Sequence, residues 1–219
     1  MRQALTNIDT VLMVSASETR DRVSQHQIFI DAAAAAGVPH LVYISFYGAA
    51  PEATFTLARD HWATEQHIQR SGLPFTFLRD NLYADFFPQM VGDDGVLRGP
   101  GGTGRVAAVA QDDIADAAVL KDPAAHAGAT YELTGPEALI LEDVAATLSQ
   151  VTGRTITYHD ETLAEAYESR ASYGAPDWQV DAWVSTYTAI ANGSLAQVTD
   201  AIPSLSGHPA TPLVEVLRQ

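Results

Sequence analysis

Small polar side chains stand at the ends of three short apolar runs, where their types and positions could do chemistry. Ser15 ends the first run, Ser45 lies near the end of the second, and Asn81 follows the third. Hydroxyl and amide groups both donate and accept hydrogen bonds, so they can orient a small polar ligand. They can also cap helices that follow the runs, and both interpretations stay open. The runs are Thr10–Ser15 (TVLMVS), His40–Phe46 (HLVYISF) and Phe75–Arg79 (FTFLR).

His61 and Glu65 form a second candidate group, because they are four residues apart in a segment with helical periodicity. Side chains at this spacing lie on one helix face and can interact. A neighbouring carboxylate raises the pKa of a histidine, so the pair could relay a proton. The alternative is a histidine packed between helices with a surface partner. None of the histidine spacings matches a zinc site, and we expect no metal.

Three aromatic residues follow the third run. Tyr83, Phe86 and Phe87 could form the wall of a pocket for an aromatic substrate. Aromatic side chains near the end of a strand also commonly belong to the core, and both interpretations stay open.

One basic residue lies among these candidates. Arg79 could bind a phosphate or a carboxylate of a ligand, or it could pair with Asp80 or Asp113 as a structural ion pair. We expect Asp113 to support the start of a helix. We assign Trp178 and Trp183 to the core.

The elements that must position these residues follow from periodicity. The apolar runs lack alternation, which predicts strands buried on both faces, as in a parallel sheet. Helical patterns extend to about Ala36 after the first run and from about Thr56 to Arg70 after the second, and each ends in Gly-x-Pro. This order predicts an α/β fold with a doubly wound parallel sheet of the Rossmann type over residues 1–135. The pattern beyond is mostly helical and predicts a smaller substrate cap over residues 136–219.

Composition limits the classes of partner and site. The 219 residues carry a formal net charge of −15 and no cysteine. A surface this acidic repels nucleic acid and anionic lipid. We therefore expect neither as a partner. The missing cysteines exclude disulfides and thiolate chemistry. No apolar run could span a membrane and no secretory signal is visible, so we expect a cytoplasmic protein that acts on a small molecule.

Glycines do not stand where a dinucleotide-binding fold needs them. Such folds place a G-x-G-x-x-G turn after the first strand, and no such turn precedes Thr10. The cluster Gly99–Gly104 lacks the strand-then-helix context, and we expect a flexible loop there. If the first strands are absent, the run from Thr10 becomes an exposed edge strand. Such an edge pairs with other chains, so we expect a homodimer, aggregation or a marginally stable fold.

Several short motifs together resemble the NmrA-like atypical short-chain dehydrogenase/reductases. The nearest branch is that of the NAD(P)H:quinone oxidoreductases and triphenylmethane dye reductases. The resemblance covers nearly the whole chain from about Leu5. The motifs that carry it are Gln25-His26, Ala35-Ala36-Gly37-Val38 with His40, Leu57-Ala58-Arg59-Asp60-His61 with Thr64-Glu65, Ser71-Gly72-Leu73-Pro74-Phe75-Thr76, Leu78-Arg79-Asp80-Asn81 with Tyr83, and Asp113-Ile114-Ala115.

The resemblance implies a reductase that uses NADP or NAD, with NADP favoured, and that reduces quinones or similar small aromatic acceptors by hydride transfer. Relative to the family, the chain begins at the fourth strand of a Rossmann-type sheet. The family places nicotinamide at the carboxyl ends of the next strands, which here implies contacts from Ser15, Ser45, Phe46 and Asn81.

The resemblance also indicates how the family's tyrosine–lysine pair is replaced. His61 stands in the place of the lysine that holds the ribose, and Leu57 stands in the place of the tyrosine. Quinones and cationic dyes accept hydride readily, so such a branch needs no strong protein acid. Two alternatives remain: a dinucleotide-sensing or partner-binding protein without turnover, and an inactive fragment that lacks the glycine-rich loop.

Overall fold

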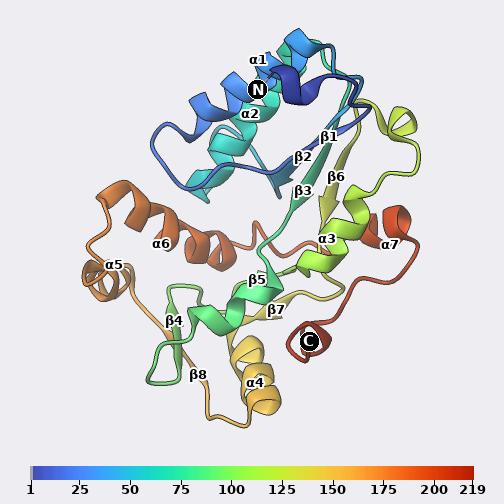
Figure 1. The fold of residues 1–219 in the computed structure, drawn as a ribbon. Coiled ribbons are helices and arrows are strands. Elements are labelled where there is room, and N and C mark those ends of the chain that lie inside the picture. The colour runs from blue at the N-terminus through green and yellow to red at the C-terminus, as the bar shows by residue number, and fades with distance from the viewer. Residues whose placement is uncertain (1) are drawn as a thin grey trace.

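A computed structural model describes residues 2–219, and its centre is a parallel four-stranded sheet (Figure 1). The strand order is β1-β2-β3-β6, and every neighbouring pair is parallel. The predicted strands at the three apolar runs are confirmed, and the doubly wound α/β fold with them. The strands are β1 (Val11–Met13), β2 (Leu41–Phe46), β3 (Phe75–Asp80) and β6 (Thr130–Leu133).

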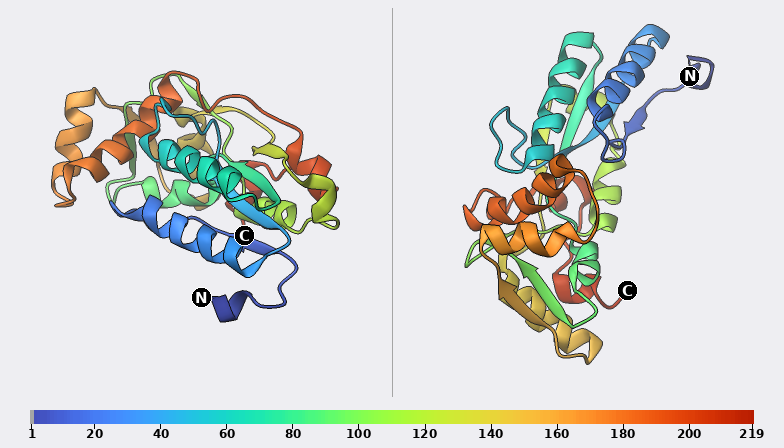
Figure 2. Two further views of the ribbon diagram at one scale, coloured as in Figure 1. Left: turned by 90° about the horizontal axis from the view of Figure 1, so that it is seen from above. Right: turned by 90° about the vertical axis from the view of Figure 1, so that its left-hand side faces the viewer.

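Two long helices cover one face of this sheet. They are α1 (Arg22–Ala36) and α2 (Thr56–Ser71), which lie side by side at the upper end of Figure 1 and of the right-hand view of Figure 2. Their apolar side chains pack on Tyr43 and Phe77 of the sheet. Both helices end at a glycine in the left-handed region, as the Gly-x-Pro pattern predicts.

The opposite face is covered only in part. The short helices α3 (Gln111–Ala118) and α7 (Ala201–Ser206) pack over β2, β3 and β6. β1 lies at the edge of the sheet, and no strand of the described residues pairs with its outer side. Leu12 is 51% exposed and Val14 just after it is 61% exposed. The predicted apolar edge strand is therefore present.

A second lobe lies below the carboxyl ends of the strands (Figure 1). It draws on residues 84–106 as well as on residues 139–196, because β4 pairs with β8 and β5 with β7. The elements of this lobe are η2 (Ala84–Met90), β4 (Val96–Gly99), β5 (Arg105–Val106), β7 (Leu139–Ile140), α4 (Leu141–Thr152), β8 (Thr157–Asp160), α5 (Leu163–Ala171) and α6 (Asp177–Ala191).

Three further elements complete the fold, and none carries a site residue. They are η1 (Arg2–Leu5), η3 (Pro123–His126) and α8 (Leu213–Val216).

No helix in residues 2–219 is both long and apolar enough to cross a bilayer.

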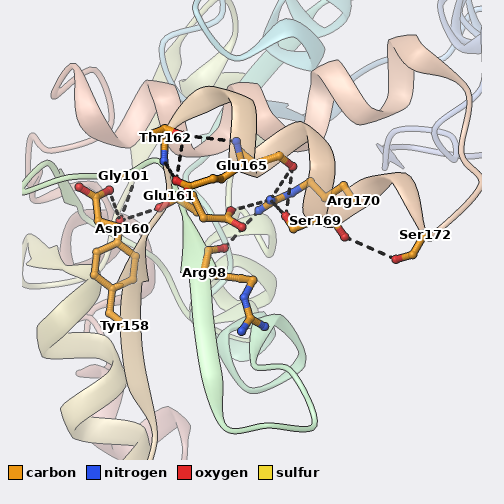
Figure 3. A network of polar contacts seen from close by, with 12 residues as sticks. Arg98, Gly101, Tyr158, Asp160, Glu161, Thr162, Glu165, Ser169, Arg170 and Ser172 are labelled. Carbon is orange, nitrogen blue, oxygen red and sulfur yellow. Dashed lines mark hydrogen bonds and ion pairs between the residues drawn. The ribbon is translucent and has the colours of Figure 1, made fainter.

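A buried ion pair fixes α5 to the strands of the lower lobe (Figure 3). Arg170 Nη1 donates to Glu161 Oε2 at 2.8 Å, and Arg170 Nη2 donates to the backbone oxygen of Arg98 at 3.1 Å. The guanidinium also lies 5.1 Å from the centre of the Tyr187 ring. Because a buried charge is tolerated only when it is paired, these contacts hold β4, α5 and α6 in one arrangement.

The glycine cluster is a close-packed strap instead of a loose loop. A Cβ on Gly99 would lie 2.2 Å from the Tyr187 ring, and one on Gly104 would lie 2.1 Å from the Ile190 backbone oxygen. The N–H of Gly101 donates to Tyr158 Oη at 3.0 Å and that of Gly102 to Asp160 Oδ1 at 2.8 Å. These two N–H groups already have hydrogen-bond partners, and the Asp160 carboxylate beside them would repel an anion. The cluster therefore does not form a phosphate-binding loop.

We predict that Gly104→Ala destabilises the protein. The new methyl group would meet backbone atoms of α6, which cannot move aside as a flexible side chain can. Overpacking of this kind costs about 1–3 kcal/mol. Chemical denaturation monitored by circular dichroism measures the loss. Thr103→Ala, at the exposed neighbouring position, is the control, and equal stability of the two variants would contradict the close packing.

Candidate functional site

Arg79 is the centre of a polar network at the carboxyl ends of the strands. Its Nε and Nη2 atoms donate to the two oxygens of Glu65 at 2.8 and 2.6 Å. Its Nη1 atom donates to Glu132 at 3.0 Å, and Ser45 Oγ donates to Glu65 at 2.5 Å. Glu132 also accepts the N–H of Gly48, just after β2, at 3.2 Å. One guanidinium therefore fixes the ends of β2, β3 and β6 against α2.

The expected partners of Arg79 were wrong. Successive side chains of a strand point to opposite faces, so Arg79 points toward α2 while Asp80 points away from it. Asp113 lies in the first turn of α3, as expected, but its carboxylate accepts the N–H and the hydroxyl of Thr211, both at 2.7 Å.

His61 is buried and neutral. Arg22 Nη2 lies 3.1 Å from its Nε2, and Tyr43 Oη lies 3.0 Å from its Nδ1. A guanidinium can only donate, so Nε2 accepts and the ring proton is on Nδ1. Burial, and then the charge of Arg22, hold the pKa of His61 well below its usual value. The expectation that Glu65 raises this pKa was wrong, since both Glu65 oxygens bind Arg79.

A second neutral histidine holds the loop after β1. The N–H of Ala16 donates to His26 Nε2 at 2.8 Å, so His26 carries its proton on Nδ1 and donates it to Thr64 Oγ1, also at 2.8 Å. Arg22 Nε donates to the oxygen of Ala16 at 2.9 Å. Burial lowers the pKa of His26 to about 4. Arg22 and His26 were not predicted as site residues. Their i, i+4 spacing in a predicted helix was the available signal.

The same loop also reaches the lower lobe. Glu18 Oε2 accepts from Gln179 Nε2 at 3.1 Å and from Trp183 Nε1 at 3.3 Å, both on α6. The Arg20 guanidinium lies 5.8 Å from the Trp178 ring. Residues 16–20 are thus bonded both to α1 over the sheet and to α6 of the lower lobe.

The predicted cofactor-binding residues differ in whether their polar atoms already have hydrogen-bond partners in the protein. Ser45 is buried and bonded to Glu65, while the Asn81 amide donates to the Leu195 oxygen at 3.0 Å and accepts from the N–H of Leu82 at 2.8 Å. Phe46 packs on Phe55, with ring centres 4.6 Å apart. Ser15 is partly exposed, and its hydroxyl makes no hydrogen bond within residues 2–219. Their contacts with a cofactor stay predictions.

The three predicted pocket aromatics lie in different environments. Phe87 is fully buried in the lower core, and Phe86 is 44% exposed. Tyr83 is half-buried, lies 5.4 Å from the Phe86 ring, and donates its hydroxyl proton to Asp80 Oδ2 at 2.8 Å. Among the described residues there is no group of three or more acidic or histidine side chains that could hold a metal.

Comparison with known proteins decides the family. The model of the NmrA-like family matches residues 1–174. The chain belongs to the NmrA-like family. This NmrA-like chain is 32% identical over 220 residues to quinone oxidoreductase 2 of Escherichia coli, covering 98% of this chain and 76% of the relative. It is 33% identical over 217 residues to an NAD(P)H azoreductase of Xenophilus azovorans, covering 97% and 75%.

Solved structures agree with this assignment. The Escherichia coli NADPH-dependent quinone oxidoreductase in complex with NADPH superimposes with a TM-score of 0.89 at 32% identity, over 99% of this chain and 77% of that one. The Citrobacter triphenylmethane reductase in complex with NADP(H) gives 0.85 at 28% identity, over 99% and 78%. The predicted resemblance to this branch and the Rossmann-type fold are confirmed.

We predict that acid weakens the fold through His26. The unfolded histidine takes up a proton near pH 6.5, whereas the folded one resists protonation down to about pH 4. The stability that His26 contributes is therefore present above pH 6.5 and is lost as the pH falls toward 4. Relative to His26→Gln, the wild type should lose at most about 1.4 kcal/mol per pH unit in this window. Chemical denaturation of both proteins at several pH values measures the difference in their free energies of unfolding. A difference that stays constant between pH 6.5 and 4 would contradict the prediction.

Proposed function

We propose that this NmrA-like chain carries the nicotinamide side of an NAD(P)H-dependent reductase that acts on quinones, dyes or similar small aromatic acceptors. The observation that carries the proposal is the rim formed by the carboxyl ends of β1, β2 and β3, where polar side chains are held by buried ion pairs. Open α/β sheets bind ligands at this edge. Relatives above 30% identity that act as NAD(P)H reductases support it.

The residues present fit a nicotinamide nucleotide. Arg22 is buried, and its Nη1 atom has no hydrogen-bond partner, the nearest carboxylate oxygen being that of Asp60 at 3.8 Å. The hydroxyl of Ser15 is also free for a ligand. Ser15, Ser45, Phe46, His61 and Asn81 remain our candidates for the residues around the bound nucleotide, which supplies the hydride.

His61 and Glu65 act in this proposal as positioning residues. A neutral His61 with both ring nitrogens bonded has no proton to give near neutral pH, because its pKa is held low. Glu65 is bonded to Arg79 and so holds Ser45 in place. These side chains keep the rim rigid, and the acceptor's own reactivity drives the reduction.

The decisive experiment is titration of the purified chain with NADPH and with NADH, followed by tryptophan fluorescence, together with quinone-dependent oxidation of the cofactor. Saturable binding with turnover supports the reductase. Binding without turnover supports a sensing role instead. No binding up to millimolar cofactor would overturn the proposal.

We predict that Ser15→Ala weakens NADPH binding. The substitution removes a hydroxyl that makes no hydrogen bond within residues 2–219, so the fold keeps its stability while one cofactor hydrogen bond is lost. A net contribution of about 0.5–1.5 kcal/mol corresponds to a two- to tenfold increase in Kd. Ser17→Ala, two residues further along the same loop and exposed, is the matched control. Identical Kd values for the two variants would remove Ser15 from the site.

We further infer that two copies of the chain associate through the unpaired edge of β1. An edge strand with exposed apolar side chains templates pairing with another chain. We expect light scattering with size exclusion to give a mass that rises with concentration, and Val14→Lys to suppress the rise. Ile28→Lys is the control, because Ile28 is as exposed as Val14 but lies on α1, and this substitution should leave the rise in mass unchanged. A monomer at every concentration would refute the association.

A further inference from the structure

Arg22 and Asp60 form a polar pair whose facing atoms make no hydrogen bond. Arg22 is the first residue of α1 and is buried, and Asp60 lies in the second turn of α2. The Nη1 atom of Arg22 has no hydrogen-bond partner and lies 3.8 Å from Asp60 Oδ2, which is too far for a hydrogen bond. The Asp60 carboxylate also makes no hydrogen bond within residues 2–219. A donor and an acceptor therefore stand side by side without a hydrogen bond between them.

The guanidinium of Arg22 is held in place by its other two nitrogens. Nε donates to the backbone oxygen of Ala16 at 2.9 Å, and Nη2 donates to His61 Nε2 at 3.1 Å. These two contacts fix the plane of the group, so Nη1 cannot turn toward another partner. Buried polar atoms in proteins nearly always have a hydrogen-bond partner, and a charged one without a partner is costly. A fixed donor that the fold leaves unsatisfied is suited to a ligand.

The pair lies at the carboxyl rim, on the sheet face that α1 and α2 cover. Arg22 contacts His61 on this face, and Ser45 is bonded to α2 on the same face. Arg22 is also bonded to Ala16, the residue that follows Ser15. The pair is therefore adjacent to the residues that we propose to surround the nicotinamide nucleotide.

A ligand can approach the pair from the side of Asp60. The Asp60 side chain is 34% exposed, whereas that of Arg22 is 6% exposed. Because no hydrogen bond holds the Asp60 carboxylate, it can change its rotamer and admit a ligand atom to Nη1. The site therefore opens without the loss of any hydrogen bond of the fold.

The chemistry of the two side chains selects the group that they can bind. A guanidinium only donates hydrogen bonds and an ionised carboxylate only accepts them, so the pair complements an acceptor beside a donor. Two neighbouring hydroxyls of a sugar meet this requirement, whereas the Asp60 carboxylate repels a phosphate. The nicotinamide ring is proposed to lie over the strand ends, so the sugar attached to it is the part that reaches the two helices.

We propose that Arg22 and Asp60 bind the two hydroxyls of the ribose next to the nicotinamide ring. This inference rests on the proposed function. One hydroxyl accepts a hydrogen bond from Nη1 of Arg22, and the other donates to the carboxylate of Asp60. His61 has both ring nitrogens bonded within the protein, so it makes no contact with the ribose and instead positions Arg22.

The test compares NADPH with an analogue whose ribose next to the nicotinamide lacks both hydroxyls. Equilibrium binding to the wild type and to Asp60→Ala is followed by tryptophan fluorescence, which needs no turnover. A hydrogen bond to a charged group contributes about tenfold or more in affinity. The wild type should therefore bind NADPH about a hundredfold more tightly than the analogue, and Asp60→Ala should reduce this ratio to about tenfold. Asp60 makes no hydrogen bond in the fold, so circular dichroism should show an unchanged structure in the variant.

Asp31→Ala is the matched control and should keep the full ratio. Asp31 is also an exposed acid, but it lies nine residues beyond Arg22 on α1, about 14 Å along the helix from the rim. A ratio near one in the wild type, or equal ratios in the wild type and Asp60→Ala, overturns the ribose site.

The carboxamide of the ring also offers an acceptor beside a donor, and a second analogue distinguishes it from the ribose. The acetylpyridine analogue of NADPH keeps the ribose but lacks the amide N–H groups. If Asp60→Ala loses discrimination against this analogue instead, the pair binds the carboxamide and the ribose site is overturned. A wild type that binds neither NADPH nor its analogues refutes the proposed function itself.

Discussion

The rim of the sheet depends on a single constraint, the pairing of buried charges around Arg79. Removing Glu65 from water is costly, and the bidentate contact with Arg79 offsets this cost only if the guanidinium keeps its position. Glu132 takes the remaining arm and binds the N–H of Gly48. The geometry of three strand ends and one helix therefore follows from one planar group.

The sequence allowed the sheet and its two long helices to be predicted, because buried parallel strands and helix-ending glycines leave strong local patterns. The site was less accessible. Spacing placed His61 and Glu65 on one helix, but it could not show that Arg79, fourteen residues away, is the stronger partner of Glu65. The pairing of Arg22 with His61 joins two helices, and such tertiary contacts have no local signal.

Two consecutive residues of β3 illustrate how the pleat separates tasks. Arg79 faces α2, and the carboxylates of Glu65 on α2 and Glu132 on β6 accept its hydrogen bonds, so its surroundings favour charge. Asp80 faces the other side, where its direct partner is a phenol and burial favours the neutral acid. A strand end can thus hold a rigid ionic scaffold on one face and a titrating group on the other, a division that the sequence Leu78-Arg79-Asp80-Asn81 does not reveal by itself.

The loop after β1 has a thermodynamic consequence. It is bonded through Ala16 to α1 and through Glu18 to α6, so the end of the first strand and α6 cannot shift independently. Any molecule that orders this loop from one side lowers the entropy loss for a molecule that binds from the other. Linkage is reciprocal, so each of the two would increase the affinity of the protein for the other by the same factor.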